Sequence, residues 1–213
     1  DIKVTKTLMK KRLGLPYEEE KPDDHRIPGL VSGLYYSADG GGCLDLEGVV
    51  YDKKGSGKLE MTGKLGDVMK ESLNLVHSHM AAKQHEYGCS IYDLKNVNIH
   101  VHVPSGSTPK DGPSAGAAFS LLLASLAANY PVRPRLAMTG ECTLTGRITA
   151  IGGVDQKCAG AVRMGMEHII LPKANKRDYD MLPAKLKKAA TYYFVTTVAE
   201  VIDIGLNYEE IED

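Results

Sequence analysis

The alternation of short strand-like runs with longer helix-like patterns limits the fold of this chain more than any other feature. The runs "LVSGLYYS", "GCLDLEGVVYD" and "KLEMTG" are separated by glycine-rich turns, and we predict that they form an antiparallel meander. Apolar residues then recur at three- and four-residue steps over about 65–86, which predicts an amphipathic helix. Strand-like and helical patterns alternate from there onward, for example in "NVNIHVHVP" and "VDQKCAGAVRMG". This order predicts an α/β class with mixed α+β layers, short sheets and packed helices.

The first 28 residues differ in character from the rest of the chain. Residues 1–28 combine a short helical piece with a charged, proline-containing stretch, which is typical of a linker. We place the domain boundary near Pro28, so that residues 29–213 form one domain, and this length can bury a sizeable core. The chain begins without methionine, and we therefore expect it to be a piece of a longer or processed protein.

Composition argues against several kinds of partner. The 26 basic and 27 acidic residues leave a formal net charge of -1, so no global positive field would attract nucleic acid or an anionic membrane. No apolar run approaches the roughly 18 residues of a membrane-spanning helix, and the N-terminus lacks the apolar core of a secretory signal. The four cysteines contain no C-x-x-C pair, which indicates reduced thiols in an intracellular protein: Cys43, Cys89, Cys142 and Cys158.

Two glycine-lysine pairs suggest a phosphate-binding loop at first sight. A P-loop requires serine or threonine directly after the lysine, whereas Leu59 and Leu65 follow the lysines here. Turn formation explains the glycines, and we expect no nucleotide cofactor in this chain.

The histidines do not form a convincing metal site. His100 and His102 lie two apart on a predicted strand and therefore share one face, but a zinc site needs three or four ligands. We expect them to be polar side chains beside a site, and we predict no metal. His77, His79 and His85 lack the i, i+4 spacing that would direct two rings to one ion, and we expect them at the surface.

Ser114 stands where a polar loop runs into an apolar helical pattern, in "STPKDGPSAGAAFSLLLASLAA". A serine at such a junction can cap the helix, because its hydroxyl accepts a hydrogen bond from a free N–H of the first turn. It can also be a nucleophile. The local sequence by itself favours the cap.

Lys157 lies in the first turn of the helix predicted in "IGGVDQKCAGAVRMG". The N-terminus of a helix carries positive potential, which together with burial would favour the neutral amine and lower its pKa, as a general base requires. The alternative is a solvated lysine beside Asp155, and the local sequence favours it, because most lysines are exposed.

Several motifs, taken together and in order, resemble the proteolytic domain of the Lon proteases. They are "GKLEMTGKLGDVMKES", "TPKDGPSAGAAF", "LAMTGECTLTG", "IGGVDQKCAGAVRMG" and "ILPKANKRD". The resemblance covers about residues 29–206, and "KTLMKKRLG" is similar to the end of the helical part of Lon's ATPase module. The resemblance implies a serine endopeptidase that uses a Ser/Lys dyad.

The resemblance also assigns roles to individual residues. Ser114 would be the nucleophile, Lys157 the general base, and Thr139 the residue that hydrogen-bonds the lysine. The N–H groups of Ser114 and of the Asp111–Gly112 turn would form the oxyanion hole, while Lys110 and the Asp111 side chain would shape the loop. A strand edge at Gly41 and Gly42 would pair with the substrate, although three glycines followed by Cys43 depart from the family pattern there.

For the full-length protein the resemblance implies unfolded or damaged protein substrates, a homo-hexamer, and ATP with Mg bound by an ATPase module that residues 1–213 lack. The location would be the bacterial cytoplasm or the mitochondrial matrix. Two other classes remain as alternatives. A small-molecule kinase of the galactokinase type also places a Pro-, Gly- and Ser-rich loop before an Ala-rich helix, but it explains neither Lys157 nor "AMTGE". An inactive scaffold domain would not need Ser114 and Lys157 intact.

Overall fold

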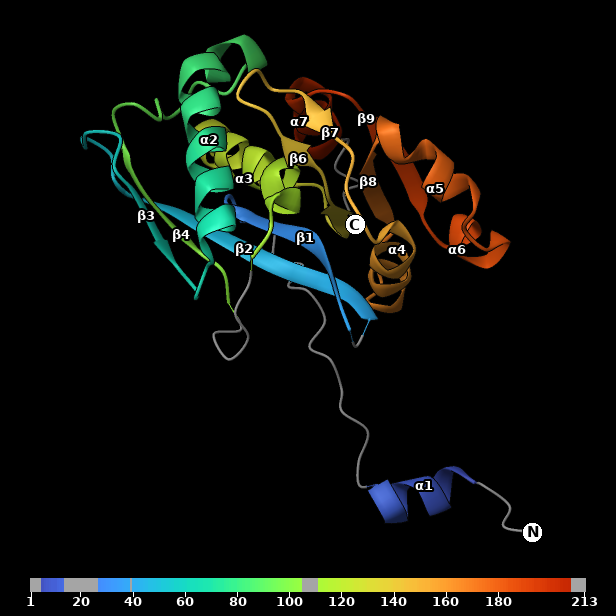
Figure 1. Cartoon of the computed structure of the whole chain (residues 1–213). Helices are drawn as coiled ribbons and strands as arrows, with labels where there is room; N and C mark the ends of the chain where they lie inside the picture. Colours follow the sequence, from blue (N-terminus) through green and yellow to red (C-terminus); the bar gives the residue numbers. More distant parts are fainter. Residues whose placement is uncertain (1–4, 14–26, 39, 105–110, 208–213) are drawn as a thin grey trace, which may run out of the picture.

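The computed structural model describes residues 5–13, 27–38, 40–104 and 111–207 (Figure 1). Its helices are α1 (Lys6–Leu13), α2 (Asp67–Lys83), α3 (Gly116–Ala128), α4 (Val154–Arg163), α5 (Lys176–Asp180), α6 (Ala184–Ala189) and α7 (Val198–Leu206). Its strands are β1 (Leu30–Ser37), β2 (Gly40–Asp52), β3 (Leu59–Thr62), β4 (Asn98–His102), β5 (Leu136–Met138), β6 (Glu141–Cys142), β7 (Ile148–Thr149), β8 (His168–Pro172) and β9 (Thr191–Val195). The predicted mixed α/β class is confirmed.

Among the described residues, a seven-stranded sheet has the order β3-β4-β2-β1-β5-β8-β9, and β6 and β7 form a separate hairpin. The pairs β1–β2 and β2–β4 are antiparallel, whereas β3–β4, β1–β5, β5–β8 and β8–β9 are parallel. The predicted meander is therefore wrong at its third strand, because β4 separates β3 from β2. The reason is the long helix α2, which connects β3 to β4 and allows these strands to run parallel.

The central strands of the sheet have a hydrophobic core on each face. Because side chains alternate along a strand, Met138 and Ile170 join the core that contains α3, while Ala137 and Ile169 join a second core that contains α4. Figure 1 shows α2 and α3 together over β1 and β2, and α5 and α6 over the β8–β9 end. Helix α3, which follows Ser114, and helix α4, which carries Lys157, thus pack against opposite faces of the sheet.

Helix α3 is the central element of the larger core. Every residue from Gly116 to Ala127 is buried, which explains its uniform Ala, Leu and Phe content. Its two buried serines are satisfied locally, since Ser120 Oγ donates to Gly116 O at 2.8 Å and Ser125 Oγ donates to Tyr130 O at 2.5 Å. A helix packed on all sides holds the turn at its N-terminus in a fixed position.

Helix α4 lies directly against the backbone of β2. A Cβ on Gly160 would overlap the carbonyl group of Gly41, and a Cβ on Gly41 would overlap the carbonyl group of Gln156. Arg163 adds a hydrogen bond from its guanidinium to Gly41 O at 2.7 Å. The glycines therefore permit the close approach that brings α4 to the sheet.

We expect Gly160→Ala to destabilise the protein although alanine favours helices. The added methyl group has no space against the β2 backbone, and forced overpacking of this kind should lower Tm by about 4–8 °C. Thermal unfolding followed by circular dichroism measures the shift. Gly152→Ala is the matched control, because its Cβ would meet only the Tyr36 hydroxyl at an ordinary 3.6 Å. An unchanged Tm in Gly160→Ala would contradict the close packing.

The other expectations for the fold have mixed outcomes. The short N-terminal helical piece is present as α1, and the helix predicted over about 65–86 is present as α2, continued by a 3-10 turn at Gln84–Tyr87. Helix α6 was not predicted. The boundary near Pro28 adjoins residues 14–26, which lie outside the described residues, and it stays a prediction. No helix in the described ranges is long and apolar enough to cross a membrane.

Candidate active site

Ser114 lies in a 3-10 turn, Pro113–Ala115, immediately before α3. The prediction that it caps the helix is wrong, because the cap position is Ala115 and no side chain bonds the first turn. The backbone supplies a partner instead: Ala117 N donates to Gly140 O at 2.9 Å. The hydroxyl of Ser114 is thereby left for another partner.

That partner is Lys157, which α4 carries into the interior. The lysine is only 1% exposed, so the solvated alternative is wrong. Its Nζ donates to Ser114 Oγ at 3.1 Å and to Thr139 Oγ1 at 3.0 Å. The structure thus brings together the three side chains that the sequence motifs singled out.

Thr139 determines the direction of this hydrogen-bond chain. Its hydroxyl donates to the carbonyl oxygen of Ser114 at 3.2 Å, so its lone pairs remain to accept from Lys157. Gly140 N also donates to Ser114 O, at 2.9 Å. The start of the loop after β5 therefore fixes both the backbone of Ser114 and the amine of Lys157.

Burial controls the protonation of Lys157. Removal from water disfavours the ammonium form and lowers the pKa of Lys157 to about 8, while the charge interaction with Cys158 acts weakly in the opposite direction. No carboxylate within the described ranges forms an ion pair with this lysine. The Tyr36 ring lies 5.6 Å from Nζ. The amine can thus lose its proton near neutral pH, as a general base must.

A pocket of about 590 Å³ opens at these groups. Lys157 and Ser114 lie in its wall, and the remaining lining comes from β1, the loop before Ser114, β6 and the segment before α4. Those residues are Tyr35, Tyr36, Asp111, Gly112, Pro113, Glu141, Ala150, Ile151 and Gly152. The volume suits a few residues of an extended peptide or a small ligand.

Asp111 and Gly112 form one wall of the pocket. Asp111 Oδ1 accepts from Met69 N and from Gly112 N, each at 2.9 Å, so this carboxylate ties the loop to the first turn of α2. This contact supports a loop-shaping part for Asp111. The Gly112 N–H expected in an oxyanion hole donates within the loop in this structure. Lys110 lies outside the described residues.

Gly41 and Gly42 occupy a different place from the one expected. They pair with Tyr36 and Tyr35 across the β1–β2 hairpin and do not line the pocket. Because Gly41 packs against α4 and its carbonyl accepts from Arg163, we find no open edge at Gly41 for a substrate. The tyrosines of β1 line the pocket instead.

The histidines lie away from this pocket. His100 and His102 lie on β4, and each forms a hydrogen bond with Thr62 Oγ1, at 2.9 and 2.7 Å. The surface prediction is wrong for His79, whose buried ring bonds Tyr87 Oη and Leu144 O and joins α2 to the β6–β7 hairpin. It is wrong in part for His77, which is half-buried and whose pKa burial lowers.

Two features of the described residues bear on metal and nucleotide binding. No group of three or more His, Cys, Asp or Glu side chains within the described ranges could hold a metal ion. Helix α2 follows the second glycine-lysine pair, but Asp111 already occupies the Met69 N–H in its first turn. An anion would have to displace that carboxylate, so these residues do not fit an ATP phosphate.

Among the pocket-wall residues that sequence reasoning missed, Tyr35, Tyr36 and Glu141 carry the largest side chains with polar or charged groups. The tyrosines are adjacent at the end of a strand, so their side chains point to opposite faces, and both are exposed here. Glu141 directly follows Thr139 and Gly140, which form hydrogen bonds with Ser114 and Lys157. Its neighbour Cys142 packs against Gly116, which leaves Glu141 on the pocket side of β6.

A serine hydroxyl bonded to a buried, readily deprotonated amine is the arrangement of a candidate serine hydrolase. Comparison with known proteins agrees with this class. The family described as the Lon protease (S16) C-terminal proteolytic domain matches residues 3–208. The chain therefore belongs to that family.

Individual relatives give the same result. The chain is 42% identical over 212 residues to "Lon protease" of Halothermothrix orenii, which covers 99% of this chain and 27% of that protein. It is 44% identical over 195 residues to "Lon protease homolog, mitochondrial" of Ostreococcus lucimarinus, covering 91% and 21% respectively. It is 45% identical over 190 residues to "Lon protease" of Magnetococcus marinus, covering 89% and 23%. The chain thus spans about a quarter of the length of these relatives.

Proposed function

We propose that this chain is the peptide-cleaving part of a Lon-type serine protease, with Ser114 and Lys157 as its catalytic dyad. One observation carries the proposal: the hydrogen bond of 3.1 Å between a hydroxyl and a buried amine in the wall of an open pocket. Membership of the family supports it. Thr139 is the positioning residue, because it holds the amine at 3.0 Å from its own hydroxyl.

The reaction starts with Lys157 neutral. The Ser114 hydroxyl then donates its proton to Nζ as Oγ attacks the scissile carbonyl carbon, forming a C–O bond and a tetrahedral oxyanion. Collapse of this intermediate breaks the C–N bond, and the ammonium returns the proton to the leaving amine. Water hydrolyses the remaining ester in the same way, with Lys157 again as base, and Ser114 is regenerated.

Backbone N–H groups would stabilise the oxyanion. The Ser114 N–H stands at the start of a buried helix, where the macrodipole adds positive potential. Gly112 N–H can contribute once it is released from the Asp111 carboxylate, since it donates to that group at 2.9 Å in this structure. Substrate binding would therefore need to rearrange this short turn.

The substrate would pair as a strand with β1 rather than at Gly41 and Gly42. Within the described residues, β1 pairs with β5 only at Ser32 and Gly33, which leaves the segment from Leu34 onward unpaired on that side. Tyr35 and Tyr36 of this segment line the pocket beside Ser114. An extended peptide can add to such an edge through main-chain hydrogen bonds.

For the whole protein, we propose unfolded or damaged proteins as substrates and a homo-hexamer as the assembly. ATP and Mg would act in an ATPase module outside residues 1–213, because neither glycine-lysine pair in this chain forms a P-loop. The bacterial cytoplasm or the mitochondrial matrix would be the location. The names of the relatives, which include bacterial Lon proteases and mitochondrial homologues, support this part of the proposal.

Labelling of an activated serine tests the proposal directly. A fluorophosphonate probe should label residues 1–213 at Ser114, and a peptide boronate should block that labelling. The chain should also cleave short or unfolded peptides weakly, without a response to ATP, and it should leave folded proteins intact. Mass spectrometry of the labelled peptide and a fluorogenic peptide assay measure these results. Absence of labelling, or ATP-stimulated degradation of a folded protein by this chain alone, would contradict the proposal.

A further inference from the structure

Glu141 differs from every other group in the pocket wall. It is an acidic residue, it is partly buried, and its carboxylate forms no hydrogen bond or ion pair with any residue in the ranges that the structure describes. Asp111, the other acidic residue of the wall, is engaged by two backbone N–H groups. Glu141 is therefore an acceptor without a partner at the place where substrate binds.

The backbone around Glu141 holds its side chain toward the pocket. The short strand β6 pairs Glu141 with Thr149 and Cys142 with Ile148, and side chains alternate along it. Cys142 is buried, and Gly116 has no side chain because the Cys142 backbone occupies that space. Thr149 Oγ1 also contacts Glu141 O at 3.5 Å. A fixed backbone of this kind is what a selective contact needs.

The rest of the wall would not balance this charge. Ala150, Ile151 and Gly152 are uncharged, and the two tyrosines of β1 offer aromatic surface. The lysine of the pocket is buried and is bonded to Ser114 and Thr139. A cationic side chain of the substrate would thus meet one free carboxylate, while Lys157, the one basic residue of the lining, is held by Ser114 and Thr139.

We propose that Glu141 is a specificity-determining residue that selects peptides with lysine or arginine at one position close to the scissile bond. The inference rests on the proposed function of the Ser114 pocket. A partly buried ion pair should favour lysine over glutamine at that position by about fivefold in kcat/KM, and glutamate should be the poorest choice.

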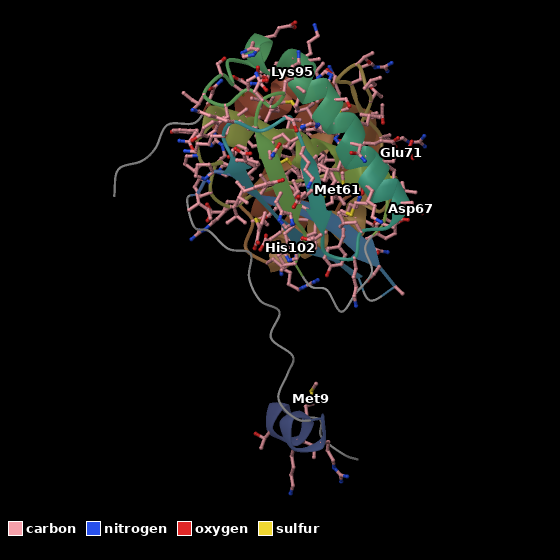
Figure 2. All side chains as sticks on the ribbon, turned by 90° about the vertical axis from the view of Figure 1, so that its left-hand side faces the viewer. Met9, Met61, Asp67, Glu71, Lys95 and His102 are labelled. Carbon is pink, nitrogen blue, oxygen red and sulfur yellow. The ribbon has the colours of Figure 1, made fainter. Side chains whose placement is uncertain are left out.

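The test uses fluorogenic peptides that carry lysine, glutamine or glutamate at one position at a time on each side of the scissile bond. At the selected position, Glu141→Gln should reduce the lysine preference to about onefold, and Glu141→Lys should reverse it in favour of glutamate. The preference of the unmodified chain should weaken as salt is raised. Glu71→Gln, an exposed residue of α2 labelled in Figure 2, is the matched control and should keep the full preference.

The outcomes separate this inference from the proposed function. Hydrolysis with the same lysine-to-glutamine ratio in the unmodified chain and in Glu141→Gln would overturn the role of Glu141 and leave the dyad untouched. Complete lack of hydrolysis would count against the proposed function instead. In that case, fluorescence anisotropy of the same peptides with the Ser114→Ala chain still tests Glu141, and equal affinity for lysine and glutamine peptides would overturn it.

Discussion

Ser114→Ala should abolish peptide hydrolysis while the fold remains intact. Lys157 Nζ bonds two hydroxyls, those of Ser114 and Thr139. Of these, the substitution removes the one that lines the pocket, whereas the buried Thr139 hydroxyl donates to Ser114 O and does not line it. Loss of an activated nucleophile removes the covalent route, so the rate should fall by at least about a thousandfold, to the background of the assay. Ser114 does not cap α3, and Tm should therefore change by only a few degrees.

The assay for this prediction is cleavage of a fluorogenic peptide, combined with thermal unfolding of each variant. Ser78→Ala is the matched control, because Ser78 is exposed on α2 and bonds only Asn74 O. Ser78→Ala removes the same hydroxyl oxygen from a residue that does not line the pocket, so its rate of hydrolysis should equal that of the unmodified chain. Retention of even a tenth of the activity in Ser114→Ala would remove Ser114 from the mechanism.

The sequence predicts the elements of this fold better than their arrangement. Helix α3 is evident because its apolar residues are continuous, and α2 because its apolar residues recur at helical steps. The place of β4 between β3 and β2 was not predictable from local patterns, because strand pairing joins segments far apart in the chain. Helix α6 was missed because it is short and has no buried residue to give it periodicity.

For the candidate site, too, the sequence predicts some residues and leaves others to the tertiary structure. Motif resemblance identified Ser114, Lys157 and Thr139, and the structure places them within hydrogen-bonding distance. The local sequence favours a helix cap for Ser114 and a solvated side chain for Lys157, and both predictions are wrong. The reason is that tertiary packing, which local sequence does not encode, determines the partners and the burial of these side chains. Glu141 and the tyrosines of β1 reach the pocket through hairpin geometry, for which the sequence offers no comparable motif.

The protonation of Lys157 should control activity across the neutral to alkaline range. Burial lowers the pKa of this lysine to about 8, and only the neutral amine can accept the Ser114 proton. The rate should therefore rise with pH through about 8 and then level off, without a histidine-like step near pH 6.5. A pH profile of kcat/KM measures this, and substitution of His100 by alanine should leave its shape unchanged.

The free energy of unfolding should also depend on the protonation of Lys157, and the lowered pKa fixes the direction of this dependence. Between about pH 8 and about 10.5, the unfolded chain holds a proton on Lys157 that the folded chain has released. The free energy of unfolding should therefore increase with pH across this window, and the cost of burying the amine should be largest below about pH 8. In Lys157→Met this dependence should be absent, so the difference between the two unfolding curves should grow smaller or change sign as pH rises.

Lys157→Arg should be inactive at every pH in this range although it keeps a positive charge. A guanidinium does not deprotonate here and cannot take the Ser114 proton, so the rate should fall to that of Ser114→Ala. Lys185→Arg, on the exposed surface of α6, is the matched control and should retain full activity. Substantial hydrolysis by Lys157→Arg, or complete loss of hydrolysis on replacing His100 in a folded chain, would show that another group is the base.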